Sequence, residues 1–224
     1  MIRLKKSETL QRKIRQDDLA ELGIPTWALL HQAIQAGRTD EALEFLEYGL
    51  VETQEMSYQM CSFVDDSLTC FSTHGEEGVV KALRYRYEPR VRDWLSQAPG
   101  LTEAIHLFAE TVRGHFGNQT IVEEPDRYVL TYDPCGTGGA LWRTKNVGIT
   151  KQAYPWSWGK SGIPYYCAHC CVHEIIAIEV RGYPMYVTLP PEKPEDTCVA
   201  LYYKKPELIP EEYFTRLGMT KTIQ

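Results

Sequence analysis

The sequence predicts an α+β protein in which an N-terminal helical bundle packs on a C-terminal antiparallel sheet. Apolar residues recur at helical spacing through the first half, and short segments rich in β-branched and aromatic residues occupy the second. A cluster of cysteines and histidines in the second half adds a metal site to the prediction. We expect a helical region over residues 1–117 and a Cys/His-containing α+β region over residues 118–224, together forming one compact unit.

The first half is expected to hold four to six helices. The first spans residues 9–23, because Gly23 suits the position after a helix end and Pro25 follows it. A short second helix ends at Gly37. The third spans residues 40–72, where apolar residues recur at helical spacing.

A break follows the third helix in the stretch THGEEG. There Thr73 is expected to cap the next helix, with Glu76 at the third position of a capping box. Residues 79–87 continue as a helix, which Pro89 interrupts before a shorter helical segment. Residues 101–117 form a final amphipathic helix.

The second half is expected to form the sheet. Residues 126–135 have strand composition and end in a turn. Residues 174–191 predict two strands around Gly182, and residues 197–206 predict a third. The tail from Pro206 predicts a short helix that packs back on the body.

Composition and charge narrow the functional class. The net charge is −6 and the 24 Lys and Arg are scattered, so we expect no nucleic-acid surface. The charged N-terminus lacks the apolar core of a signal peptide, and no run of about 18 apolar residues predicts a membrane span. We expect a cytoplasmic protein with a small-molecule ligand, and homo-oligomerisation remains open. Disulfides rarely persist in a reducing cytosol.

The stretch PYYCAHCCVH places three cysteines and two histidines within ten residues. The spacing Cys167-x-x-Cys170-x-x-His173 is typical of zinc ligands, because CxxC lets both sulfurs face one ion. His169 and Cys171 lie in the same span and are alternative ligands. The motif needs a further ligand from elsewhere to complete four-coordination.

The stretch DPCGTGG supplies a candidate for that ligand in Cys135. Gly136, Gly138 and Gly139 allow the backbone to approach a neighbour closely, and successive N–H groups there can bind a carboxylate or a developing oxyanion. A tight turn beside a buried cysteine is the alternative interpretation.

Two other uses of the thiols compete with zinc. An iron or iron–sulfur site could use the sulfurs of four residues: Cys135, Cys167, Cys170 and Cys171. Adjacent cysteines rarely ligate one cluster, and the usual ferredoxin spacings are absent from the sequence. Thiols without any metal are the second competitor.

The aromatic stretch YPWSWGKSGIPYY precedes the cluster. Trp156 and Trp158 are expected to form one wall of a ligand pocket, and Lys160 can bind an anionic ligand. A packed loop that covers the sheet is the alternative.

Candidate catalytic groups lie beside the cluster and on the long helix. Glu174 follows the cluster directly, and Asp65 neighbours the apolar stripe of its helix, so either can serve as a base. A solvated acidic face is the alternative for Asp65. In a metal-free enzyme, Cys135 or Cys167 would attack as a thiolate whose pKa is lowered by His169 or His173.

The C-terminal stretch, from YYCAHC to ALYYKKP, resembles the end of the 4-vinyl reductase-like domains and of the L-2-amino-thiazoline-4-carboxylic acid hydrolase family. The matching positions are Glu179 in a strand, Gly182 in the following turn and Cys198 before an aromatic strand. DPCGTGG together with YYCAHC is also similar to a motif pair of uncharacterised bacterial proteins. The resemblance implies a small-molecule pocket between helices and sheet.

These features together predict a metal-dependent enzyme, with zinc as the ion, that acts on a small organic anion by hydrolysis or a lyase-type step. The expected ligands are Cys135, Cys167, Cys170 and His173. A small-molecule sensor with a purely structural zinc site and a metal-free cysteine hydrolase are the alternatives.

Overall fold

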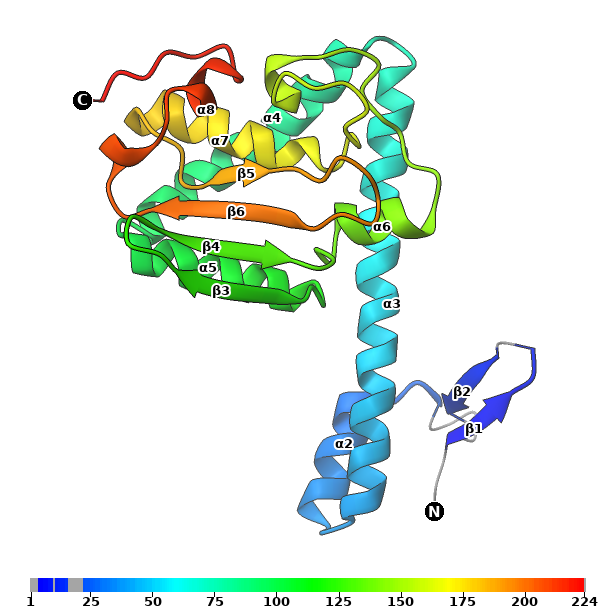
Figure 1. Cartoon of the computed structure of the whole chain (residues 1–224). Helices are drawn as coiled ribbons and strands as arrows, with labels where there is room; N and C mark the ends of the chain where they lie inside the picture. Colours follow the sequence, from blue (N-terminus) through cyan, green and yellow to red (C-terminus); the bar gives the residue numbers. More distant parts are fainter. Residues whose placement is uncertain (1–3, 10, 16–21, 224) are drawn as a thin grey trace. The chain divides into compact units, whose positions relative to one another are not determined.

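The computed structural model describes residues 4–9, 11–15 and 22–223 and confirms the predicted α+β class. The chain divides into two compact units, Met1–Ser57 and Tyr58–Gln224. The boundary that the sequence pattern indicates after residue 117 therefore lies inside the second unit. Figure 1 shows the elements of both units in sequence colours.

The first unit begins with a β-hairpin. β1 (Leu4–Ser7) pairs antiparallel with β2 (Arg12–Arg15). The helix predicted over residues 9–23 is therefore wrong for 11–15, while 16–21 lie outside the described residues. Gln11 turns the chain at a positive φ of 53°, and this charged segment has too few apolar residues for periodicity to decide between helix and strand.

The next two helices follow the prediction, and the second of them continues past Ser57 into the second unit. α2 (Thr26–Gln35) is the short second helix, and α3 (Thr39–Ser72) is the long third one. Gly49 of α3 allows close packing, because a Cβ there would lie 3.1 Å from the indole of Trp27. The buried residues of this small core are Leu29, Ala33, Ala42 and Phe45.

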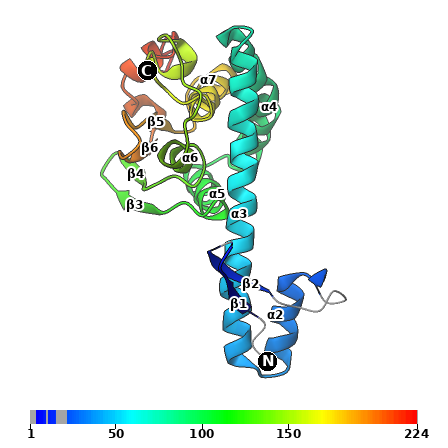
Figure 2. The same ribbon diagram turned by 90° about the vertical axis from the view of Figure 1, so that its right-hand side faces the viewer.

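The second unit is layered. Figure 2 shows the sheet on the left and α5 and α7 next to it. The C-terminal part of α3 and α4 lie to the right of these two helices, away from the sheet. α4 (Glu76–Gln97) packs extensively on α7. The other helices and 3₁₀ turns are α5 (Leu101–Gly114), α6 (Gly138–Thr144), η1 (Pro155–Ser157), α7 (Ala168–Arg181), η2 (Pro206–Leu208) and α8 (Glu212–Thr215).

The sheet is antiparallel in the order β3-β4-β6-β5. Its strands are β3 (Gln119–Glu123), β4 (Arg127–Tyr132), β5 (Val187–Leu189) and β6 (Cys198–Tyr203). Tyr132 lies opposite Cys198 in the register. β4 and β6 match the predicted strands, whereas β3 was not predicted, because most of its residues are exposed and lack a clear alternation.

α7 corrects the prediction most directly. Residues 174–181, expected to be a strand, are helical, and Gly182 ends the helix in the left-handed region with φ 86°. The helix is buried on most of its circumference, so its apolar run lacks the polar face that identifies a surface helix. The helical form decides the site, because it places His169 and His173 one turn apart.

The start of α4 also differs from the prediction. Thr73 donates its hydroxyl proton to the Cys70 carbonyl and caps nothing, so the capping box does not form. Glu76 turns inward instead. α4 continues through Pro89 without the predicted break.

Glu76 anchors the aromatic loop onto α4. Its carboxylate accepts the backbone N–H of Lys151 at 2.9 Å and the hydroxyl protons of Tyr154 at 2.7 Å and Tyr165 at 2.8 Å. Burial opposes ionisation, but these three donors outweigh it and lower the pKa of the carboxyl group.

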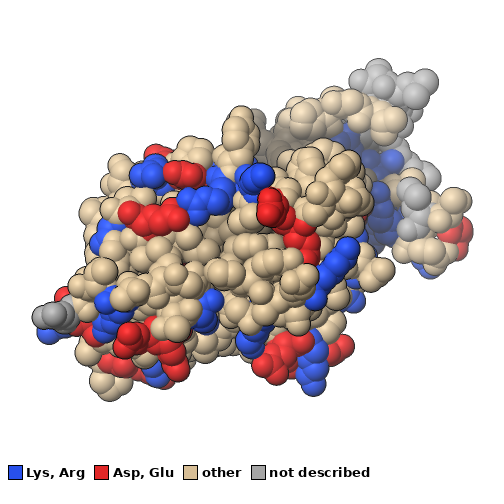
Figure 3. Space-filling view, turned by 90° about the horizontal axis from the view of Figure 1, so that it is seen from above, with Lys and Arg blue, Asp and Glu red and all other residues tan. Residues whose placement is uncertain are grey.

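Surface charges are largely compensated locally. Figure 3 shows basic and acidic side chains interspersed on one face of the molecule. Along α4, Glu88 lies within 3.9 Å of Arg84 and 2.9 Å of Arg92. Over the described part of the chain, no helix combines the length and the apolar character needed to cross a bilayer.

The glycine loop before α6 provides a test of close packing. Gly136→Ala should lower the free energy of unfolding by about 1–3 kcal/mol, because the new Cβ would lie 1.8 Å from the His115 carbonyl oxygen. Urea unfolding measures the change. Gly114→Ala is the matched control, since a methyl group there would meet no neighbouring atom within 4 Å and alanine favours the helix. Unchanged stability of Gly136→Ala would contradict the packing.

Glu76 predicts a dependence of stability on pH. Glu76→Gln should cost about 1–3 kcal/mol at pH 7, because the hydrogen bonds to an ionised acceptor are lost. The folded-state pKa lies below the ordinary value of 4.5, so this stabilisation is complete above 4.5 and disappears as the pH falls through the folded value. Urea unfolding between pH 7 and about 3.5 should show the gap to wild type closing. Glu77→Gln, at an exposed neighbour, should leave the profile unchanged.

Candidate metal centre

A cavity of about 400 Å³ lies inside the second unit, a size typical of small-molecule sites. The inner face of the sheet, α3, α4, α5 and α7 and the adjoining loops contribute to its walls. Seven aromatic side chains line it: Tyr87, Trp94, Phe108, Tyr132, Trp158, Tyr166 and Tyr186. The predicted pocket between helices and sheet is therefore present.

The cavity also collects thiols and imidazoles from distant parts of the chain. The cysteines and histidines that line it are Cys61, Cys135, Cys167, Cys170, Cys198, His115, His169 and His173. All four predicted metal ligands are among them. However, the ligand atoms that lie close together in the structure are not those of all four predicted residues.

Three residues of α7 form a compact ligand group. One nitrogen of His169, the sulfur of Cys170 and one nitrogen of His173 all lie within 4.8 Å of one another. Within the described residues, no other group of three such side chains is equally close. Side chains four apart on a helix share a face, which brings the two imidazoles together. This group could hold a metal ion, whereas Cys135 and Cys167 lie outside it.

The hydrogen bonds of His169 favour the tautomer whose Nε2 can bind a metal ion. Its Nδ1 contacts the backbone carbonyl of Tyr166, which can only accept, so Nδ1 carries the proton. Nε2 then holds a lone pair and lies 3.4 Å from the sulfur of Cys170. Burial lowers the pKa of His169 to about 4, so the ring is neutral near pH 7. Metal-binding histidines commonly donate their second N–H to such a carbonyl.

His173 is held equally firmly. Its Nδ1 lies 2.8 Å from the hydroxyl oxygen of Tyr186, and Tyr87 and Trp94 meet the ring edge-on at 4.6 and 5.1 Å between centroids. Its Nε2 is buried and has no hydrogen-bond partner among the described residues. Burial lowers the pKa of His173, so it too is neutral. A buried nitrogen without a partner is costly unless a ligand satisfies it.

Three thiols of the cavity are protonated in the absence of a cation. Burial raises the pKa of Cys167, Cys170 and Cys198. A bound metal ion would reverse this effect by favouring a coordinated thiolate. Metal binding should therefore release a proton from Cys170.

The glycine loop makes room for sulfur atoms. A Cβ on Gly138 would lie 2.6 Å from the sulfur of Cys167, and one on Gly139 would lie 3.1 Å from that of Cys135. Gly139 also donates its N–H to the Cys135 sulfur at 3.1 Å. Gly136, Gly138 and Gly139 line the cavity as predicted. The N–H of Gly139 is already used, so it is not the free anion donor that the sequence indicated.

Only part of the predicted aromatic wall reaches the cavity. Trp158 lines it, whereas Trp156 packs against Tyr154 with ring centroids 4.9 Å apart. Lys160 is exposed and pairs with Glu192 at 3.1 Å. Trp156 and Lys160 are therefore not cavity contacts.

Glu174 is buried outside the cavity lining. Its carboxylate accepts the indole N–H of Trp158 at 2.9 Å and the backbone N–H of Thr188 at 2.8 Å, and it pairs with Arg216 at 2.8 Å. These contacts occupy the carboxylate. It is consequently not placed to act as the base in the cavity that the sequence indicated.

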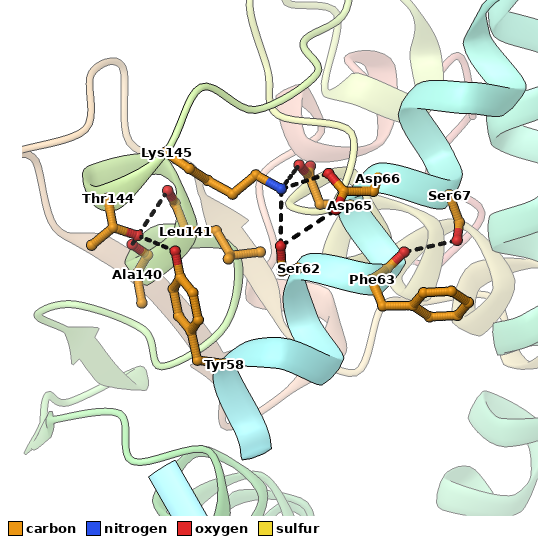
Figure 4. A network of polar contacts seen from close by, with 10 residues as sticks. All are labelled: Tyr58, Ser62, Phe63, Asp65, Asp66, Ser67, Ala140, Leu141, Thr144 and Lys145. Atoms are coloured by element: carbon orange, nitrogen blue, oxygen red, sulfur yellow. Dashed lines mark hydrogen bonds and ion pairs between the residues drawn. The ribbon is translucent and has the colours of Figure 1, made fainter. Parts of the chain in front are cut away.

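Asp65 likewise has a structural partner. Figure 4 shows Lys145 reaching Asp65, Asp66 and Ser62 of α3. The Lys145 ammonium lies 3.3 Å from Asp65, 2.6 Å from Asp66 and 3.0 Å from the Ser62 hydroxyl. The network joins the end of α6 to α3. Asp65 is buried but does not line the cavity, so this carboxylate is not brought to the predicted site.

The structure differs from the sequence-based sets of cavity cysteines at two positions, Cys171 and Cys198. Cys171 is buried away from the cavity, between the N–H of Trp158 and the carbonyl of Pro155, both at 3.3 Å. The four-cysteine cluster that included Cys171 is therefore not assembled. Cys198 lines the cavity instead. The sequence indicated Cys198 only as a position of the family resemblance and not as a cavity residue, because the pairing of its strand with β4 was unknown.

The strand expected at Glu179, one of the positions that carry the resemblance, is not formed. This residue lies on α7 rather than on a strand, and its carboxylate pairs with Arg84 at 2.6 Å on the surface. Comparisons of the chain with protein families, curated proteins and solved structures found no match. The site is therefore interpreted from its geometry alone.

The structural role of Glu174 can be separated from a catalytic one. Glu174→Gln should lower the free energy of unfolding by about 1–3 kcal/mol, because Arg216 loses its buried anion, while the metal content stays unchanged. Urea unfolding and elemental analysis measure the two quantities. Glu179→Gln, which breaks a more exposed pair on the same helix, should cost about 1 kcal/mol or less. Equal effects of both substitutions would contradict the assignment.

Proposed function

We propose that the protein is a metal-dependent enzyme that acts on a small organic anion, by hydrolysis or a lyase-type step, with His169, Cys170 and His173 holding the ion. The observation that carries the proposal is the convergence of these three ligand atoms within 4.8 Å at the wall of a cavity. Three protein ligands leave one position of a four-coordinate ion open. An open position facing a pocket is the arrangement that a catalytic site requires.

Zinc is the ion that this donor set favours. Neutral imidazole nitrogens combined with a thiolate suit a borderline-soft ion. When bound, such an ion supplies Lewis-acid chemistry to a substrate. All seven cysteines are free thiols, which suits a reducing compartment and supports a cytoplasmic location.

Proton transfer in the cavity falls to imidazoles, thiols and tyrosine hydroxyls. Among the described residues, no Asp or Glu lines the cavity. Outside the ligand group, the buried Cys61 accepts a hydrogen bond from the Tyr166 hydroxyl at 3.7 Å. The more accessible Cys135 accepts the Gly139 N–H at 3.1 Å and lies 3.7 Å from the Thr137 hydroxyl. Cys135 is therefore our candidate for a group that reacts with the substrate or transfers a proton.

The contacts of Cys135 also support a second candidate function. A metal-free enzyme would use this sulfur as the nucleophile, because a nucleophilic cysteine needs access to substrate and a nearby polar environment. The unpartnered Nε2 of His173 favours the metal-dependent function, since a metal-free mechanism leaves it without a partner.

A purely structural zinc site requires a fourth protein ligand. Cys135 and Cys167 line the cavity but lie outside the compact group, so either would have to approach the ion. X-ray absorption spectroscopy distinguishes the two roles. Four protein ligands without an exchangeable water would support the structural site, and three would support the catalytic one.

Metal content provides the direct test of the ligand set. Purified wild-type protein should bind about one equivalent of zinc, and His169→Ala, Cys170→Ser and His173→Ala should each lose most of it. Cys167→Ser should retain it, because Cys167 lies outside the group. Elemental analysis and competition with a chromogenic chelator measure stoichiometry and affinity.

Cys61→Ser is the matched control, because this buried thiol lines the cavity from α3 and contributes to no ligand group. Metal-free wild-type protein that remains active would overturn the metal-dependent function and favour Cys135 as a nucleophile. Loss of zinc in Cys167→Ser with retention in His169→Ala would instead favour the ligands predicted from the sequence.

A further inference from the structure

The cavity differs in charge from the rest of the protein. Arg86 and Arg90 are the only lysines or arginines among its described lining residues, and no carboxylate offsets them there. The chain as a whole carries a net charge of −6. The field inside the cavity therefore favours an anion, against the overall charge of the molecule.

The two arginines lie at the accessible edge of the cavity. They are four residues apart on α4 and share one face of the helix. Both side chains are exposed, and the described residues offer Arg86 no carboxylate within 4.0 Å. Arg90 has only the exposed Asp93 at 3.6 Å. Two guanidinium groups are thus available to a ligand.

Aromatic rings connect these guanidinium groups with the metal ligands. The Arg86 guanidinium lies 5.7 Å from the ring centroid of Tyr87, and that of Arg90 lies 5.1 Å from Trp94. Tyr87 in turn stacks on His169 at 5.2 Å, and Trp94 meets the His173 ring at 5.1 Å. A flat apolar body can lie along these rings while its charged end stays at the arginines.

The glycine loop is poorly suited to hold the charged group. Gly139 donates its N–H to the Cys135 sulfur, and the next two N–H groups, of Ala140 and Leu141, donate to carbonyls of the loop. These N–H groups are therefore committed. Arg86 and Arg90, in contrast, are the cationic donors among the described lining residues of the cavity.

We propose that the cavity binds a small, flat, aromatic carboxylate, with its carboxylate on Arg86 and Arg90 and its ring against Tyr87 and Trp94. A guanidinium group suits a carboxylate because it can donate two parallel hydrogen bonds. The proposal names the substrate class for the proposed function and rests on that function for the reaction. The binding itself needs no bound metal.

The test compares an acid with its neutral isostere. Full-length protein is titrated with 2-naphthoate and with 2-naphthamide by isothermal calorimetry. Wild-type protein should bind the acid at least about tenfold more tightly, since charge-assisted hydrogen bonds exceed neutral ones. Arg86→Gln/Arg90→Gln should weaken acid binding by roughly 10-fold to 100-fold and leave amide binding nearly unchanged.

Two further variants serve as controls. Arg92→Gln removes an exposed arginine of the same helix that pairs with Glu88 and does not line the cavity, so it should bind the acid as wild type does. Arg86→Lys/Arg90→Lys keeps both charges but loses the forked geometry, and its affinity should be intermediate. Unchanged amide binding reports that the cavity is intact in each variant.

The outcomes separate this proposal from the metal site. Equal affinity for acid and amide, no saturable binding of the acid, or acid binding that survives loss of both arginines would each overturn the carboxylate site. Elemental analysis of the same samples reports the metal independently. Protein without metal that still prefers the acid through its arginines would leave this proposal standing and overturn the proposed function.

Discussion

The packing of α4 on α7 is the interaction on which the site depends. From α4, Tyr87 and Trp94 lie against the imidazoles of α7 and fix the orientation of His169 and His173. An ion pair between Arg84 of α4 and Glu179, near the C-terminal end of α7, also joins the two helices. Aromatic contacts of this kind restrict the orientation of an imidazole ring and leave the lone pair on its nitrogen free to bind a ligand. The interface therefore orients the two candidate metal ligands and leaves their lone pairs available.

Buried carboxylates secure the scaffold around this interface rather than taking part in the site. Glu76 holds the aromatic loop to α4, Glu174 joins α7 to Trp158 and Arg216, and Asp65 meets Lys145. An ionised group inside a protein needs such partners to offset the loss of water. A carboxylate that is held by such partners does not serve as a base in the cavity.

The cavity lining combines neutral metal-binding groups with two positively charged arginines at its accessible edge. His169, Cys170 and His173 are uncharged when no cation is bound, because burial disfavours their ionised forms. A metal ion would deprotonate Cys170 and occupy the lone pairs of the two histidines. Arg86 and Arg90 add charge only where solvent still reaches them. In the proposed complex, the ion, the aromatic ring and the carboxylate of the ligand would each occupy a different part of the cavity.

The sequence by itself determined α2, α3, α5 and the strands β4 and β6, because periodicity and turn residues act locally. It also identified Cys135 and the cluster around Cys170 as cavity residues. It could not distinguish a buried helix from a strand at α7, since an element covered on most sides has no polar face to reveal its period. Only the tertiary structure decided that His169 joins the ligand group, that Cys198 lines the cavity and that the carboxylates do not. The first outcome follows from the helical form of α7. The other two depend on contacts between segments far apart in the chain, which no local pattern encodes.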